Sequence, residues 1–159
     1  MKEELQKYFT EFDKLLEELE SKIPFSDVVN SKISKASVGW HLEHTLITFN
    51  DFIDTLDKSK PEDYKWKFNF IRNIVLITKL IPRGFGMSPK DLLSKTLTTN
   101  EQLYKYLAET KKNIKRLEFI PEDRFIVHPV FGQLKLMQTI NFLDTHTKHH
   151  LKIISDILN

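Results

Sequence analysis

The chain of 159 residues carries 24 basic and 22 acidic side chains, so its net charge of +2 gives no electrostatic reason to expect nucleic acid or an anionic membrane as the main partner. It contains no cysteine, which excludes disulfides, zinc–thiolate sites and a cysteine nucleophile. With 40% hydrophobic and 29% charged residues, the composition is that of an ordinary globular protein, and we expect one domain over residues 1–159.

A first helix is predicted over residues 2–23, where apolar side chains recur every three or four positions until Pro24 ends the pattern. Its start, MKEELQKYF, is charged and periodic and therefore differs from a signal peptide. A connector, PFSDVVNSKISKA, follows. The second helix is predicted to run from about Ser37 to about Lys58.

The sequence SKPE at residues 59–62 is typical of a capping box, with a serine cap, a proline in the first turn and a glutamate that reaches back to the free amides. It predicts a third helix that continues to about Leu80. This helix holds the longest apolar-rich run, NFIRNIVLITKLI, which includes two basic residues and is too short to cross a bilayer. We therefore expect a cytoplasmic protein. PRGFGMSPKD then breaks the helix, and Ser88 and Asp91 are predicted to cap one short turn.

A second capping box, Thr98 with Glu101 in TTNE, predicts a helix that ends near Leu117. Residues 121–132, PEDRFIVHPVFG, are predicted to form a loop, and a last helix is predicted over about 134–158. These elements predict an all-α protein, a four-helix bundle with an additional short or fifth helix.

The last helix contains a cluster of three histidines in the sequence DTHTKHHLKII. Helical geometry places His146 and His150 about 40° apart on the apolar face, whereas His149 lies about 60° to the other side of His146, at the edge of that face. A buried imidazole without partners for its nitrogens costs a few kcal/mol. A shared divalent metal is the simplest explanation for the pair, since ligands four residues apart suit coordination from one helix. Core histidines bonded to a carbonyl or a threonine are the alternative.

Three histidines lie elsewhere, His41 and His44 in SVGWHLEHT on the second helix and His128 in the loop sequence HPVFG. His44 lies roughly opposite the most apolar stripe of its helix, beside Thr48 and Asp51 on a semi-polar face. This position fits a histidine that lines a wet cavity, and it fits a surface histidine nearly as well. HExxH, ExxH, P-loop and GxSxG motifs are all absent from the sequence.

The sequences SVGWHLEHT, HPVFG and HTKHHLKII, in this order along the chain, resemble the DinB-like superfamily, which includes bacillithiol and mycothiol S-transferases. The resemblance implies a four-helix bundle in which three histidines hold one divalent metal. It matches His44, His146 and His150 to the ligands and His149 to a middle histidine that does not bind the metal. It leaves His41 unmatched. His128 resembles a loop anchor for the last helix.

The resemblance further implies a metal-dependent enzyme, a thiol S-transferase acting on a small molecule. A metal-dependent hydrolase and a non-catalytic binding protein remain open. Zinc, nickel or iron(II) would suit histidine ligands, and a low-molecular-weight thiol is the candidate second cofactor. The candidates for contacts around the ligands are His41, Thr48, Asp51 and His149, and no general base is assigned. We expect no nucleic-acid or membrane partner, and a homodimer is left open.

Overall fold

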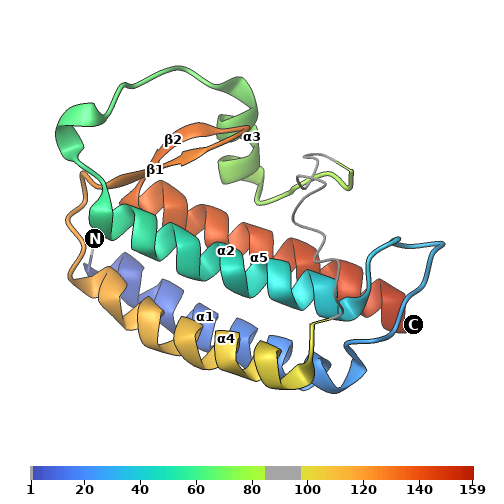
Figure 1. Ribbon diagram of the computed structural model, residues 1–159. Coiled ribbons are helices and arrows are strands. Elements are labelled where there is room, and N and C mark those ends of the chain that lie inside the picture. The colour runs from blue at the N-terminus through green and yellow to red at the C-terminus, as the bar shows by residue number, and fades with distance from the viewer. Residues whose placement is uncertain (1, 85–97) are drawn as a thin grey trace.

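Four long helices lie side by side in the computed structural model, which describes residues 2–84 and 98–159 (Figure 1). These helices are α1 (Lys2–Lys22), α2 (Val38–Lys58), α4 (Asn100–Ile114) and α5 (Leu136–Leu158). Helix α2 packs against α4 and α5, and α1 packs against the same two helices. Their buried apolar side chains form one connected core. The described chain is therefore mostly helical, and its main helices share a single hydrophobic interior.

The boundaries of α1 and α2 confirm the predicted ones. Helix α1 ends at Lys22, and Pro24 lies within a short 3-10 turn, Ile23–Phe25. Helix α2 is capped by Ser37, whose hydroxyl oxygen accepts a hydrogen bond from the backbone N–H of Trp40 at 3.1 Å. A serine hydroxyl satisfies one of the free amides at the start of a helix, so the local sequence sets this boundary.

Gly39 allows the connector between α1 and α2 to approach the first turn of α2 closely. Its backbone N–H donates to the carbonyl oxygen of Ser26 at 2.7 Å. A Cβ at this position would lie 2.9 Å from the same oxygen, closer than side-chain carbons normally approach. The connector is thus held against the helix that carries two of the histidines.

The prediction of a third helix beginning at residues 59–62 is wrong. Ser59 donates a hydrogen bond to the carbonyl oxygen of Leu56 at 2.9 Å and so closes α2. Pro61–Asp63 forms only a 3-10 turn (η2), and α3 (Phe70–Thr78) begins after Asn69, which accepts from the backbone N–H of Arg72 at 2.8 Å. The intervening KWKFN alternates charged or polar with aromatic residues, a period that favours extended backbone over helix.

Helix α4 departs from its prediction at both ends. The cap of α4 is Thr99, one residue after the predicted Thr98, and the helix passes into a 3-10 turn, Lys115–Glu118 (η4). The predicted turn capped by Ser88 and Asp91 lies outside the described residues.

The predicted loop at residues 121–132 contains a strand and belongs to a β-hairpin. Strands β1 (Phe125–His128) and β2 (Gly132–Lys135) pair antiparallel, with Phe125 opposite Lys135 and His128 opposite Gly132. Gly132 has a φ of 70°, which a glycine adopts at little cost, and the chain reverses just before it. The prediction of an all-α fold broadly holds, since the described chain is mostly helical and adds only this two-stranded sheet. Helix α5 begins at Leu136 instead of near residue 134.

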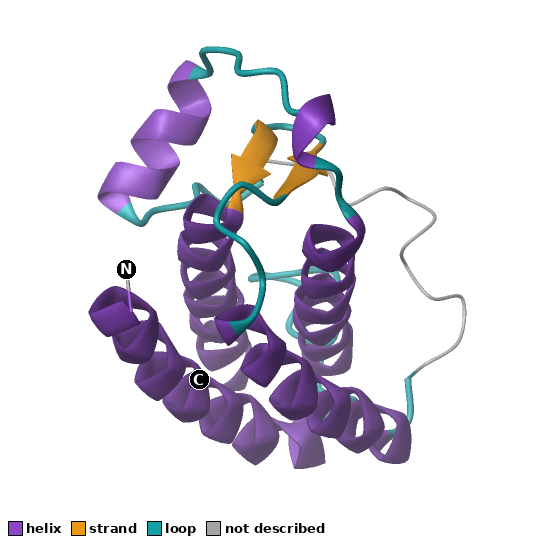
Figure 2. Cartoon of the chain, turned by 90° about the vertical axis from the view of Figure 1, so that its left-hand side faces the viewer, coloured by secondary structure: helices purple, strands orange, loops and turns teal. Residues whose placement is uncertain are grey.

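Helix α3 and the hairpin lie together over one end of α2 and α5 (Figures 1 and 2). The guanidinium of Arg72 donates to the carbonyl oxygen of Gln133 at 3.1 Å, and the Asn69 side chain donates to the carbonyl oxygen of Val130 at 2.9 Å. These bonds fix the hairpin, and with it His128, above the helices that carry the other histidines. Within the described part of the chain, no helix has both the length and the hydropathy needed to cross a membrane.

Candidate metal centre

Four histidines from two helices meet at the seam between α2 and α5. His41 and His44 come from α2, and His146 and His150 come from successive turns of α5. The ring centroids of His44, His146 and His150 lie 4.5–5.0 Å from one another, and the ring of His41 lies 5.2 Å from that of His150. The packing of α2 against α5 thus places His146 and His150 next to His44, which lies on the semi-polar face of α2.

The nitrogen atoms of His44, His146 and His150 converge on one point. The Nε2 atom of His146 lies 3.2 Å from that of His44 and 3.1 Å from that of His150. One nitrogen from each of the three residues lies within 4.8 Å of the others, a grouping that could hold a metal ion. Two nitrogens at 2.0–2.1 Å from one zinc ion would be separated by about 2.9–3.4 Å for bond angles between octahedral and tetrahedral. The two separations measured from His146 Nε2 fall within this interval.

These three nitrogens cannot satisfy one another by hydrogen bonding. A neutral imidazole nitrogen is either a donor or an acceptor, and each acceptor nitrogen has a single lone pair. His146 Nε2 faces two nitrogens of the same kind, so at most one good hydrogen bond forms there. The set is therefore well suited to a common electrophile, which would accept all three lone pairs.

Burial keeps the imidazoles in the form that a metal requires. Loss of hydration lowers the pKa of His44 to about 4. It holds the pKa of His146 and of His150 well below the usual range, and the neighbouring histidines lower both further. The three rings are neutral at pH 7, and neutral imidazole nitrogens offer a lone pair to a metal without first releasing a proton.

Aromatic side chains fix two of the three rings. The indole of Trp40 stacks on His44, with centroids 5.0 Å apart and planes at 4°. The ring of Phe142 stacks on His146 at 5.2 Å and 27°. Among the described residues, the Nδ1 atom of His146 is buried without a hydrogen-bond partner. Packing therefore orients these two imidazoles.

Of the residues expected to surround the ligands, His41 and His149 lie beside the ring of His150, whereas Thr48 contacts only the main chain of His44. The Nδ1 atom of His41 lies 2.9 Å from that of His150. The ring of His149 is 5.3 Å from that of His150. The hydroxyl of Thr48 donates to the backbone carbonyl of His44 at 2.7 Å and so contacts the main chain of that residue.

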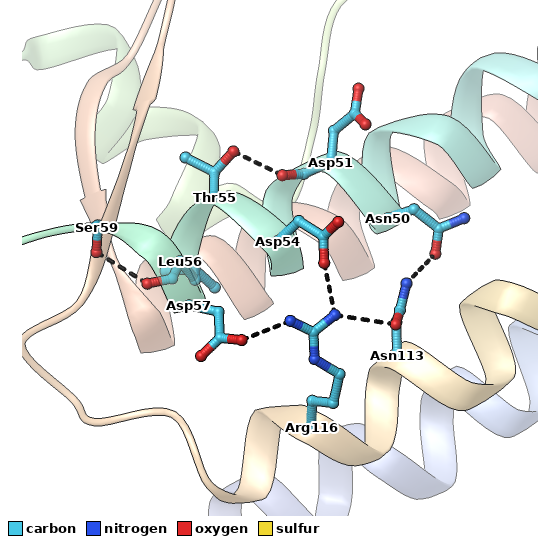
Figure 3. A network of polar contacts seen from close by, with 9 residues as sticks. All are labelled: Asn50, Asp51, Asp54, Thr55, Leu56, Asp57, Ser59, Asn113 and Arg116. Atoms are coloured by element: carbon cyan, nitrogen blue, oxygen red, sulfur yellow. Dashed lines mark hydrogen bonds and ion pairs between the residues drawn. The ribbon is translucent and has the colours of Figure 1, made fainter.

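The structure does not bring the Asp51 carboxylate to the histidines. Asp51 is exposed. Its pKa is raised, first by the partial loss of hydration of the carboxylate and then by the neighbouring carboxylates of Asp54 and Glu109. Figure 3 shows its side chain on the outer surface of α2, while its backbone carbonyl accepts from Thr55. The position of Asp51 on the semi-polar face of α2 predicts a contact with the ligands. The structure instead leaves this carboxylate at the surface.

His128 is bonded to the backbone of the hairpin turn, and its role as a loop anchor for the last helix stays a prediction. Its Nδ1 atom accepts from the backbone N–H groups of Val130 and Phe131 at 3.1 and 3.2 Å. Its ring packs 4.8 Å from Phe142, which in turn stacks on His146. The hairpin therefore reaches the histidine cluster through ring contacts that run from His128 through Phe142 to His146.

Two contributors had no signal in the sequence. Ser34 lies in the connector, and its hydroxyl is 3.0 Å from the Nε2 atom of His41. Phe142 has the spacing of an ordinary core residue, so its stacking on a histidine could be recognised only in three dimensions.

No protein-family model, curated protein or solved structure matches this chain.

Proposed function

We propose that the protein is a DinB-like helical bundle that binds one divalent metal ion through His44, His146 and His150. The observation that carries this proposal is the convergence of three Nε2 atoms from two helices, with separations of 3.1 and 3.2 Å along two edges of the group. Zinc, nickel and iron(II) all accept imidazole ligands, so the donor set fits the metal class without selecting one member.

The proposed site fits a catalytic role better than a structural one. Three protein ligands leave at least one coordination position for water or substrate, whereas structural zinc sites fill all four positions with side chains. A bound metal would act as a Lewis acid that lowers the pKa of a coordinated thiol or water. The protein itself holds the ligand rings in place through Trp40 and Phe142 and keeps them neutral by burial.

The reaction that we propose is transfer of a thiol to a small electrophilic molecule, and it rests on the resemblance to the thiol S-transferases of the DinB-like superfamily. Hydrolysis by a metal-bound water would use the same ligands. The two reactions differ in the nucleophile, so a panel of thiols offered with one electrophilic test substrate would separate them: product containing sulfur supports transfer, and hydrolysed substrate supports the alternative.

Metal binding is tested by elemental analysis of the untagged protein, since a histidine tag would itself bind metal. We expect about one equivalent of divalent metal per chain. His44→Ala, His146→Ala and His150→Ala should each abolish it, because two remaining imidazoles hold a metal weakly. His149→Ala is the matched control and should retain the metal. Full metal content in all three ligand variants would overturn the proposal, and wild-type protein that neither contains nor binds metal would favour a non-catalytic binding protein.

A further inference from the structure

We propose that His41 is a positioning residue that selects the nitrogen with which His150 binds the metal; this rests on the proposed function. The His41 and His150 rings meet through their Nδ1 atoms at 2.9 Å, and both residues are buried, with 4% and 7% of their surface exposed. His150 therefore uses its two nitrogens in different directions, with Nε2 toward the ligand group and Nδ1 toward His41.

The hydrogen bonds along this direction form a chain that is consistent with only one placement of protons when a metal is bound. If His150 gives the Nε2 lone pair to the metal, its proton lies on Nδ1 and is donated to Nδ1 of His41. His41 must then carry its own proton on Nε2, from which it donates to the hydroxyl of Ser34 at 3.0 Å. Ser34 also accepts from the backbone N–H of Ala36 at 3.1 Å.

The reverse placement would work against metal binding. If His41 donated from Nδ1, the Nδ1 atom of His150 would be the acceptor and its Nε2 would carry a proton directed at His146. That proton would occupy the lone-pair direction that a metal needs. In the first placement, Ser34 accepts from Nε2 of His41, which leaves Nδ1 of His41 free to accept from His150. The connector thus supports, through His41, the tautomer of His150 that leaves Nε2 open to a metal.

His150 is held differently from the other two proposed ligands. His44 and His146 are stacked on Trp40 and Phe142, respectively. For His150, the directional contact is the hydrogen bond to His41. A partner that orients a metal-binding histidine and fixes its tautomer typically contributes about 10–100-fold to metal affinity.

The test compares zinc dissociation constants, measured by competition with a chromophoric chelator, for wild-type protein and three variants. His41→Phe keeps the ring volume and removes both nitrogens, and it should weaken zinc binding by about 10–100-fold. His41→Asn places an amide oxygen near the position of Nδ1 and should recover much of that loss. His149→Phe changes another ring in contact with His150 and should leave the affinity unchanged. Equal affinity of wild-type protein and His41→Phe would overturn the inference.

A spectroscopic measurement on the wild type does not depend on how the variants fold. In zinc-loaded protein labelled with ¹⁵N, His150 should carry its proton on Nδ1, and His41 should have an unprotonated Nδ1 and a protonated Nε2. A proton on Nδ1 of His41 would contradict the inference while leaving the three-histidine site intact. Wild-type protein that binds no zinc, nickel or iron(II) would instead overturn the proposed metal site and, with it, the role of His41.

Discussion

Helix α2 carries two polar clusters, one on the side that faces α4 and one on the side that faces α5. On the α4 side, the Asn113 amide donates to the side-chain oxygen of Asn50 at 2.9 Å, and Arg116 donates to Asp54 and Asp57 at 2.5 and 2.6 Å (Figure 3). Each N–H donor of this network faces an amide or carboxylate oxygen that accepts the hydrogen bond. Such a network satisfies its own polar groups and requires nothing from outside.

On the α5 side, like groups face like groups. Nε2 meets Nε2 among His44, His146 and His150, and Nδ1 meets Nδ1 between His150 and His41. The Asn50–Asn113 pair is as buried as the His146–His150 pair, so burial alone does not distinguish the two clusters. The difference lies in complementarity: the donors and acceptors of the asparagine–arginine network pair with one another, whereas the histidine nitrogens would be completed by the metal ion that we propose. We therefore expect substitutions on the α4 side to change stability and those on the α5 side to change metal binding.

The largest of three further effects is expected for Asn113→Ala. The substitution removes the donor to Asn50 and leaves a buried amide oxygen without a partner, so the free energy of unfolding should fall by about 2–3 kcal/mol. Urea denaturation measures this loss, and a zinc titration of the folded variant should give the wild-type affinity. Asn50→Leu combined with Asn113→Leu removes both partners and should cost less than the single change. Loss of zinc affinity without loss of stability would reverse the roles assigned to the two sides.

The spacing of residues along the sequence predicted much of the histidine cluster on the α5 side of α2 but little of the asparagine–arginine network on its α4 side. The spacing of His146 and His150 placed both on the buried face of the last helix, and the structure agrees. His44 could not be chosen from its helix alone, since its face is semi-polar and a partner helix decides whether that face is covered. The pairing of Asn50 with Asn113 joins residues 63 positions apart, and no local periodicity records such a contact.

The contact of Ser34 with His41 and the strands of the hairpin were missed for a related physical reason. Ser34 is positioned by backbone bonds between the connector and the first turn of α2, such as that from Gly39 to Ser26. The hairpin at residues 125–135 is short, and its strands are stabilised by α3 and by the core beneath them as well as by each other. Short strands depend on such tertiary contacts more than on intrinsic preference, so the sequence alone favoured a loop.

Acid should lower the stability of the histidine side through His128, whose ring lies in the hairpin and packs on Phe142 beside the cluster. Burial lowers the pKa of this imidazole from an ordinary value of 6.5 to about 4. The unfolded chain therefore binds a proton below about pH 6.5 that the folded chain does not bind until about pH 4. Stability is full above the unfolded value and falls between these limits, by about 2 kcal/mol for this partly exposed ring.

His128→Asn isolates this contribution, because the asparagine oxygen can still accept from the backbone of Val130 and Phe131. Urea unfolding of metal-free protein is measured at pH 7.5 and 4.5 with a chelator present. The stability lost between the two pH values should be smaller in the variant by about 2 kcal/mol. An identical loss in both proteins would show that the His128 ring is protonated in the folded state or that it is not buried in solution.

The smallest effect is expected for Arg116→Met, at the solvent-facing rim of the α4-side network. The Arg116, Asp54 and Asp57 side chains are 35%, 43% and 53% exposed, so water and salt screen their attraction. Methionine keeps an unbranched apolar stem, and the loss should be about 0.5–1 kcal/mol at low salt and less at high salt. A loss that equals that of Asn113→Ala and persists in salt would mean that the guanidinium orders the buried amides through its bond to Asn113 at 3.1 Å. The α4 side would then act as one cooperative unit, in which the rim holds the asparagine–arginine network together as His41 is proposed to hold the histidine cluster.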